Sequence, residues 1–130
     1  MFRSGGLQWA TDTDTTGLRE LGLQTVIDLR TSAEVELLGR PPQLDGYVRI
    51  VHIPVSEEPD LIEREGASFA RVLTALAQAD AYPAAVHCGA SVYRTGIAVA
   101  LVLSLIGSAT GRSHITTRRA GNHTCRAPPR

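Results

Sequence analysis

The sequence predicts an α/β domain built on a parallel sheet of about four strands, with helices on both faces. Short apolar stretches alternate along the chain with segments that carry helix caps or helical periodicity. Strands separated by helices are typical of parallel sheets, because each crossover helix returns the chain to the same end of the sheet. The length of 130 residues, 43% of them hydrophobic and 20% charged, suits one such domain and excludes a disordered or disulfide-dense chain.

The first half of the chain predicts two strand–helix units. Residues 2–7 form a short extended segment, and a helix of about two turns follows, capped by Thr13 or Asp14 and ended by Gly22. Residues 25–29 are β-branched and apolar, which predicts a buried strand. Ser32 is predicted to cap a second short helix, which ends at residue 38 because a glycine and two prolines follow.

The second half continues the alternation. Residues 47–55 predict a strand, and residues 84–87 a short buried one. Between them, residues 62–79 carry an apolar stripe at helical spacing, formed by Phe69, Val72, Leu73 and Leu76. Residues 95–106 predict an almost wholly apolar helix, which we expect to be central in the domain.

Charge is distributed unevenly along the chain. All thirteen acids lie at or before Asp80 with seven of the thirteen arginines, so the net charge is −6 up to that residue and +6 after it. The basic half favours anionic ligands, but the absence of lysine indicates a compositional bias and we expect no nucleic-acid partner. Residues 107–130 lack acids and apolar periodicity, which predicts a disordered or non-native basic tail after a domain over residues 1–106.

Neither a membrane segment nor a metal site is indicated by the sequence. The longest near-unbroken apolar stretch, residues 97–106, is about half of the roughly 20 residues that span a bilayer. The first ten residues lack the apolar core of a signal peptide, so we expect a cytoplasmic protein without a membrane partner. Cys88 and Cys125 show no metal-ligand spacing, which leaves Cys88 to be considered as a single thiol.

Residues 84–96 carry the pattern that indicates chemistry. A predicted strand ends in His87 and Cys88, and Arg94 and Thr95 open the next helix. A helix N-terminus and a guanidinium both favour the ionised sulfur, and the amides of the intervening loop can surround an anion. Arg94 offers a planar fork for two phosphate oxygens. The residues predicted to bind substrate are the loop residues Gly89, Ala90, Ser91, Val92 and Tyr93, together with Thr95 at the start of the next helix.

Several residues of this pattern have two interpretations. The hydroxyl of Thr95, or that of Ser91, could hydrogen-bond the sulfur, and Tyr93 could stack on an aromatic substrate or be an ordinary loop residue. The alternative for the whole pattern is a buried structural cysteine with a surface arginine. The strand before the loop and the Thr-Gly pair after Arg94 favour a phosphate-binding loop that needs no metal or other cofactor.

The chain resembles the bacterial tyrosine phosphatase family that includes the mycobacterial protein-tyrosine-phosphatase B type. Four ordered segments carry the resemblance: FRSGGL at residues 2–7, LGLQTVIDLRTSAE at 21–34, VHIPV at 51–55 and HCGASVYRTG at 87–96. The resemblance implies that Cys88 is the nucleophile and Arg94 the phosphate clamp. It also implies hydrolysis of a phosphate monoester, with a phosphotyrosine protein or a small monoester as the partner.

The loop departs from the family pattern at three positions. Ser91, Val92 and Tyr93 stand where the family has Gly, Lys and Asp. The family glycine implies a positive φ angle, in which a serine is strained. The family's Lys-Asp pair is associated with a broad substrate range that includes phosphoinositides, so its replacement disfavours lipid phosphatase activity.

The acid that protonates the leaving group is expected on the loop after residues 51–55. The candidates are Glu57, Glu58 and Asp60. In related cysteine phosphatases an aspartate about thirty residues upstream has this role. Asp60 precedes Cys88 by 28 residues and is therefore our choice, with Glu58 second.

Supporting roles are predicted for residues near strand ends. Asp28 and Arg30 form an ion pair behind the loop or line the site. His87 orients Cys88 or simply ends a buried strand, and Glu34 complements a helix dipole. Arg3 bonds the loop backbone or belongs to an ordinary loop.

Three functions are therefore considered. The first is a protein-tyrosine phosphatase with a cysteinyl-phosphate intermediate. The second is an inactive pseudophosphatase or truncated fragment that binds phosphate or phosphopeptide without turnover, motivated by the altered loop. The third is a cysteine enzyme of the rhodanese or arsenate-reductase type, which fits the Arg-Thr-Gly sequence less well.

Overall fold

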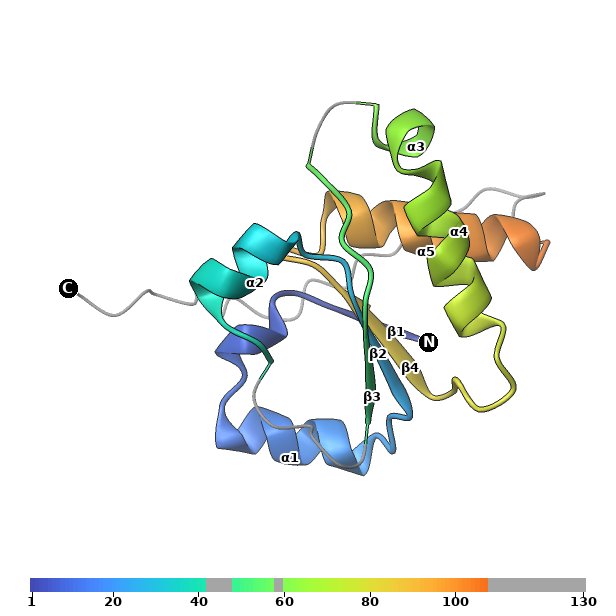
Figure 1. Cartoon of the computed structure of the whole chain (residues 1–130). Helices are drawn as coiled ribbons and strands as arrows, with labels where there is room; N and C mark the ends of the chain where they lie inside the picture. The colour runs from blue at the N-terminus through green and yellow to red at the C-terminus, as the bar shows by residue number, and fades with distance from the viewer. Residues whose placement is uncertain (42–47, 58–59, 108–130) are drawn as a thin grey trace.

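The computed structural model describes residues 1–41, 48–57 and 60–107 and shows a four-stranded, all-parallel sheet (Figure 1). The strand order is β1-β4-β2-β3. The strands are β1 (Phe2–Ser4), β2 (Thr25–Asp28), β3 (Arg49–His52) and β4 (Ala84–His87). The predicted fold class is confirmed, because helices lie between every two consecutive strands and all four strands run in the same direction.

Helices cover both faces of the sheet. The helical segments are η1 (Leu7–Trp9), α1 (Asp12–Glu20), α2 (Ser32–Leu38), α3 (Leu61–Arg64), α4 (Gly66–Leu76) and α5 (Tyr93–Leu105). On one face, Leu7 and Leu18 of η1 and α1 pack with Val26 and Ala85 of the central strands. On the other, α4 and α5 pack against the opposite side of the same strands, which gives the larger core cluster (Figure 1).

Two helices begin one to three residues earlier than the sequence predicts. Thr11 caps α1 and Thr31 caps α2, in place of the expected Thr13 or Asp14 and Ser32. In both, the carboxylate three residues on bonds back to the backbone N–H of the cap, which completes a capping box. The reciprocal pair satisfies two backbone donors and therefore prevails over a single capping side chain further along the chain.

The predicted helix over residues 62–79 is divided into α3 and α4. The break lies at Glu65, whose φ of −107° is not helical, and Gly66 begins α4. Phe69, Val72 and Leu76 of the predicted stripe are buried, as the spacing indicates. The spacing of the apolar residues correctly predicted which face of the helix is buried. It did not indicate that the helix is interrupted at Glu65.

The apolar helix α5 is less central than expected. Its side chains at the C-terminal end are largely exposed, with Leu105 at 71% and the following Ile106 at 68%. Thirteen helical residues extend about 20 Å, whereas a strand of four residues extends about 13 Å. The helix therefore extends beyond the sheet, which buries only its N-terminal half.

Other predicted boundaries differ in smaller ways. The strand predicted over residues 47–55 is confined to Arg49–His52, although Ile53 and Val55 beyond it are buried. Residue 47 lies outside the described residues, as do residues 108–130 of the predicted tail, which include Cys125.

No helix in the described ranges is both long and apolar enough to cross a bilayer.

Candidate active site

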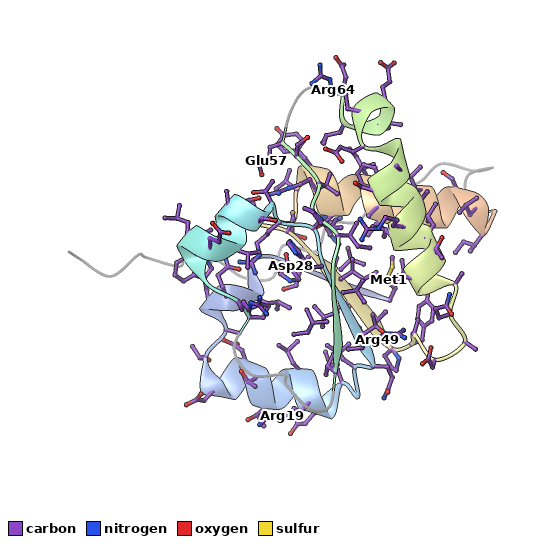
Figure 2. All side chains as sticks on the ribbon, in the orientation of Figure 1. Met1, Arg19, Asp28, Arg49, Glu57 and Arg64 are labelled. Carbon is purple, nitrogen blue, oxygen red and sulfur yellow. The ribbon has the colours of Figure 1, made fainter. Side chains whose placement is uncertain are left out.

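The site lies where the carboxyl ends of three neighbouring strands meet. Cys88 follows β4, Arg30 lies just beyond β2, and Glu57 follows the extended segment after β3. Asp28 pairs in register with both His87 and His52, so the ends of these strands are level. Asp28 lies in the interior of the molecule, whereas Arg19 and Arg64 lie at its periphery (Figure 2). Chemistry-bearing side chains gather at this edge because all the strands run parallel.

The loop from β4 to α5 curls around the Cys88 sulfur. The backbone N–H of Ser91 donates to Cys88 Sγ across 3.2 Å, and Cys88 is only 2% exposed. Ser91 has a φ of 58°, which confirms the left-handed conformation that the family glycine implied. A donor aimed at the sulfur stabilises negative charge on it, which is what a nucleophilic cysteine requires.

Arg3 of β1 supports the loop at the same residue. Its guanidinium donates through Nη2 to the Ser91 carbonyl and through Nε to Ser91 Oγ at 3.4 Å. The interpretation of Arg3 as a ligand of the loop backbone is thus the one that the structure shows. Because β1 pairs with β4, this contact holds the loop close to the strand that precedes Cys88.

Arg94 occupies the first turn of α5 and is 1% exposed. Its Nη1 donates to the Val55 carbonyl at 3.2 Å and to the Leu29 carbonyl at 3.4 Å. Burial alone would lower the pKa of the guanidinium, but its hydrogen bonds and charge pairing with Glu34 outweigh burial and raise it. The cation is therefore fixed between the ends of β2 and β3.

Glu34 is a site residue for which the sequence predicted only the role of complementing a helix dipole. Its two oxygens accept from Nη1 and Nη2 of Arg94 at 2.6 and 2.7 Å. The Arg94 hydrogen bonds, and those from Thr31, lower the pKa of Glu34 from 4.5 to about 2 although burial opposes this. The signal in the sequence was an acid at the third position of a helix that starts directly after a strand end.

Asp28 and Arg30 form the buried ion pair that was one of their two predicted roles. Arg30 Nη2 lies 2.7 Å from Asp28 Oδ2, and Arg30 Nη1 donates to the Gly39 carbonyl at 3.0 Å. Burial opposes ionisation of Asp28, yet the bonds from Arg30 prevail and hold its pKa below the ordinary value. Neither residue lines the pocket described below, so the pair supports the strand ends from behind.

The side chains of His87 and Thr95 are buried and lack, within the described ranges, the hydrogen bonds that their predicted roles require. The ring nitrogens of His87 and the hydroxyl of Thr95 have no hydrogen-bond partner among the described residues. His87 Nε2 lies 3.6 Å from Asp28 Oδ1, and burial lowers the pKa of the imidazole, so the ring is neutral at pH 7. No hydrogen bond from the His87 ring to a described residue therefore supports its predicted role of orienting Cys88.

A pocket of about 750 Å³ opens over the loop. Of the predicted site residues, it brings together Cys88, Ala90, Val92, Tyr93, Arg94 and Asp60. Gly89, Ser91 and Thr95 are not among its lining residues, and Glu58 lies outside the described residues. Leu61, Ile62 and Ile97 add an apolar wall.

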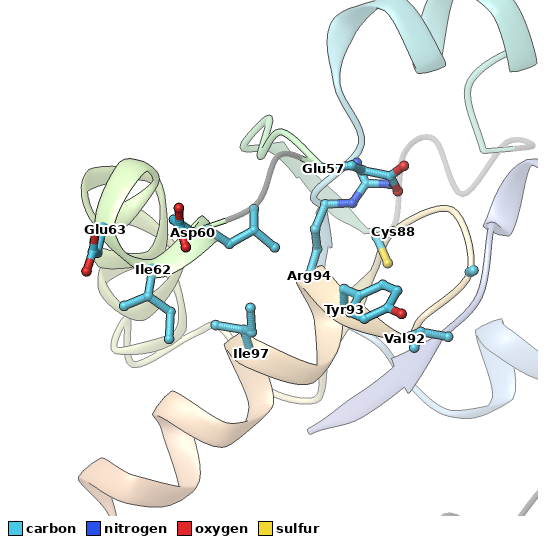
Figure 3. Close-up of a pocket in the computed structure, with 11 residues that line it drawn as sticks. Glu57, Asp60, Ile62, Glu63, Cys88, Val92, Tyr93, Arg94 and Ile97 are labelled. Carbon is cyan, nitrogen blue, oxygen red and sulfur yellow. The ribbon is translucent and has the colours of Figure 1, made fainter.

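The carboxylates of the pocket differ in position. Figure 3 shows Glu57 beside the guanidinium of Arg94, and Asp60 and Glu63 on the α3 side. The distance from Glu57 Oε1 to Arg94 Nη2 is 2.6 Å. Asp60 stands at the start of α3 with a φ of 66°, exposed to solvent.

Fold and site together define a class: a parallel α/β domain in which a strand–loop–helix segment presents a cysteine and an arginine to one pocket. The chain matches the model of the tyrosine phosphatase family over residues 1–112, and it belongs to that family.

A solved structure shares the fold. The human tyrosine phosphatase-like serine/threonine/tyrosine-interacting protein is similar with a TM-score of 0.56 and 18% sequence identity, over 79% of this chain and 68% of that one. No curated protein matches the sequence significantly.

Proposed function

We propose that the chain is a protein-tyrosine phosphatase that hydrolyses phosphate monoesters through a cysteinyl-phosphate intermediate. Family membership supports a phosphatase-type function. The observation that carries the mechanism is the convergence of Cys88 and Arg94 on one pocket, with the Ser91 amide directed at the sulfur. Within the family, the segments FRSGGL and VHIPV favour the bacterial branch that includes the mycobacterial type.

In the first step the ionised sulfur of Cys88 attacks phosphorus. The bond between phosphorus and the ester oxygen breaks, and its electron pair leaves on that oxygen. Asp60, on the pocket rim, supplies the proton that makes the leaving group neutral. Arg94 binds the equatorial oxygens, whose charge is spread in the transition state.

In the second step water attacks the phosphorus of the cysteinyl phosphate. The phosphorus–sulfur bond breaks, the sulfur leaves as thiolate, and the Asp60 carboxylate takes the proton from water. Inorganic phosphate is released. Thr95, one residue after Arg94, is proposed to donate its hydroxyl to the departing sulfur. That hydroxyl is buried and has no hydrogen-bond partner in the described part of the chain, so it is free to take this role.

The exposed apolar and aromatic side chains around the pocket favour an aromatic substrate. Tyr93 is 77% exposed and Val92 57% exposed on the pocket rim, and Ile62 is 59% exposed opposite them on α3. Such side chains can bury the ring of a phosphotyrosine, and removal of that ring from water favours binding. They give no cationic partner for a second phosphate, which disfavours a phosphoinositide.

A second candidate, phosphate or phosphopeptide binding without turnover, is favoured by one observation. Arg94, the proposed phosphate clamp, already bonds two carboxylates. A third, the rhodanese or arsenate-reductase type, would show as sulfur transfer from thiosulfate or as reduction of arsenate.

The deciding experiment is hydrolysis of p-nitrophenyl phosphate by the purified full chain. We expect turnover that vanadate inhibits and that Cys88→Ser abolishes. The control variant Ser104→Ala, on the exposed C-terminal part of α5, should keep the full rate. Phosphate binding without turnover in the unsubstituted protein would select the second candidate, and hydrolysis that survives Cys88→Ser would refute the mechanism.

A further inference from the structure

The guanidinium of Arg94 has a limited number of donors, and the structure assigns most of them. A guanidinium has two forks of parallel N–H bonds: the end fork, from Nη1 and Nη2, and the side fork, from Nε and Nη2. Glu34 accepts from both Nη atoms and therefore holds the end fork. The remaining proton of Nη1 faces the carbonyls of Val55 and Leu29. Only the side fork is left for a ligand.

Glu57 occupies half of that side fork. Its Oε1 lies 2.6 Å from Arg94 Nη2, whose other proton is taken by Glu34. No described residue accepts from Arg94 Nε. A phosphate that uses both donors of the side fork must therefore take the place of the Glu57 oxygen.

The two carboxylates differ in how firmly they are held. Glu34 is 25% exposed and its Oε2 also accepts from the N–H and the hydroxyl of Thr31. Glu57 is 72% exposed, and its bond to Arg94 is its only one within the described part of the chain. Side-chain entropy and solvent screening make such an exposed partner weak, so it can leave while Glu34 remains.

We propose that Glu57 is an internal competitor of the substrate: its carboxylate occupies the side fork of Arg94, and an incoming phosphate must displace it. The inference rests on the proposed function, because it takes Arg94 as the phosphate clamp. Glu57, which lies after β3, would then be a residue that sets the affinity of the site for the oxyanion. Glu34 has the complementary role, because it fixes the end fork and so directs the side fork at the ligand.

The test is calorimetric titration of inorganic phosphate into the full chain and two variants. Glu57→Gln keeps the shape of the side chain but removes its charge, so phosphate should bind about two- to fivefold more tightly, the factor that corresponds to an exposed ion pair. Glu63→Gln is the matched control: it removes the same charge from the same pocket without an Arg94 contact. Its gain should stay below twofold, because charges at the rim are screened.

Each outcome bears on the proposal. Equal dissociation constants for Glu57→Gln and the unsubstituted protein, weaker binding by Glu57→Gln, or an equal gain in Glu63→Gln would overturn it. Those results would leave the proposed function intact, provided that p-nitrophenyl phosphate is still hydrolysed. Absence of phosphate binding in all three proteins would overturn the inference together with the role of Arg94. Far-UV circular dichroism of both exposed-site variants should match that of the unsubstituted chain.

Discussion

Replacement of Glu34 by glutamine tests how strongly the Arg94 pair stabilises the fold. The pKa of Glu34 is about 2 in the folded chain against 4.5 ordinarily, and a shift of that size corresponds to about 3.4 kcal/mol at pH 7. The side chain is 25% exposed, so solvent screening lowers the contribution. We expect Glu34→Gln to reduce the free energy of unfolding by about 2 kcal/mol.

The pH dependence of the unfolding free energy of Glu34→Gln tests whether the ion pair causes the loss of stability. Because the folded pKa of Glu34 is the lower one, its stabilisation is complete well above pH 4.5 and is lost as the pH falls toward 2. The difference in unfolding free energy between Glu34→Gln and the unsubstituted chain should therefore fall to less than half of its value at pH 7 by pH 3.

Urea unfolding followed by circular dichroism at pH 7 and pH 3 measures this difference. Glu36→Gln, on the exposed side of the same helix, is the control and should change stability by less than about 0.5 kcal/mol at either pH. A deficit of Glu34→Gln that stays constant from pH 7 to pH 3 would show that the ion pair is not its origin. A deficit no larger than that of Glu36→Gln would refute the reasoning altogether.

Substitutions at three further positions address the loop and its supports. Ser91→Gly should raise the free energy of unfolding by about 0.5 kcal/mol, because it relieves a positive φ, whereas Ser91→Ala should not; urea titration compares them. Arg3→Ala should weaken phosphate binding severalfold with little change in stability, as calorimetry and urea unfolding would show together. Asp28→Asn should cost about 3 kcal/mol in urea unfolding, because it leaves Arg30 buried beside a neutral partner.

Much of the fold could be predicted because its signals are local. The strand over residues 84–87 and the burial of Phe69, Val72 and Leu76 follow from apolar runs and helical spacing. The exposure of the end of α5 could not be predicted, because a helix that is apolar on all sides does not indicate which side the sheet covers.

The candidate site was predicted only in part, for a related reason. Cys88 and Arg94 lie on one loop, so their proximity could be inferred from the spacing and the expected strand and helix. Glu34 and Glu57 bind Arg94 although they precede it by 60 and 37 positions in the chain. No local sequence pattern indicates contacts between residues so far apart. Sequence alone therefore indicated the cation but not the anions that surround it.

The contact between Arg3 and the Ser91 carbonyl has a consequence for the order of folding. It joins residues 88 positions apart, and the Arg94–Glu34 pair joins residues 60 apart. Contacts so distant in sequence form only after the entropy of closing the intervening chain has been overcome. During refolding from urea, recovery of phosphate affinity should thus lag behind recovery of helical signal, since local turns can form before Arg3 and Ser91 meet.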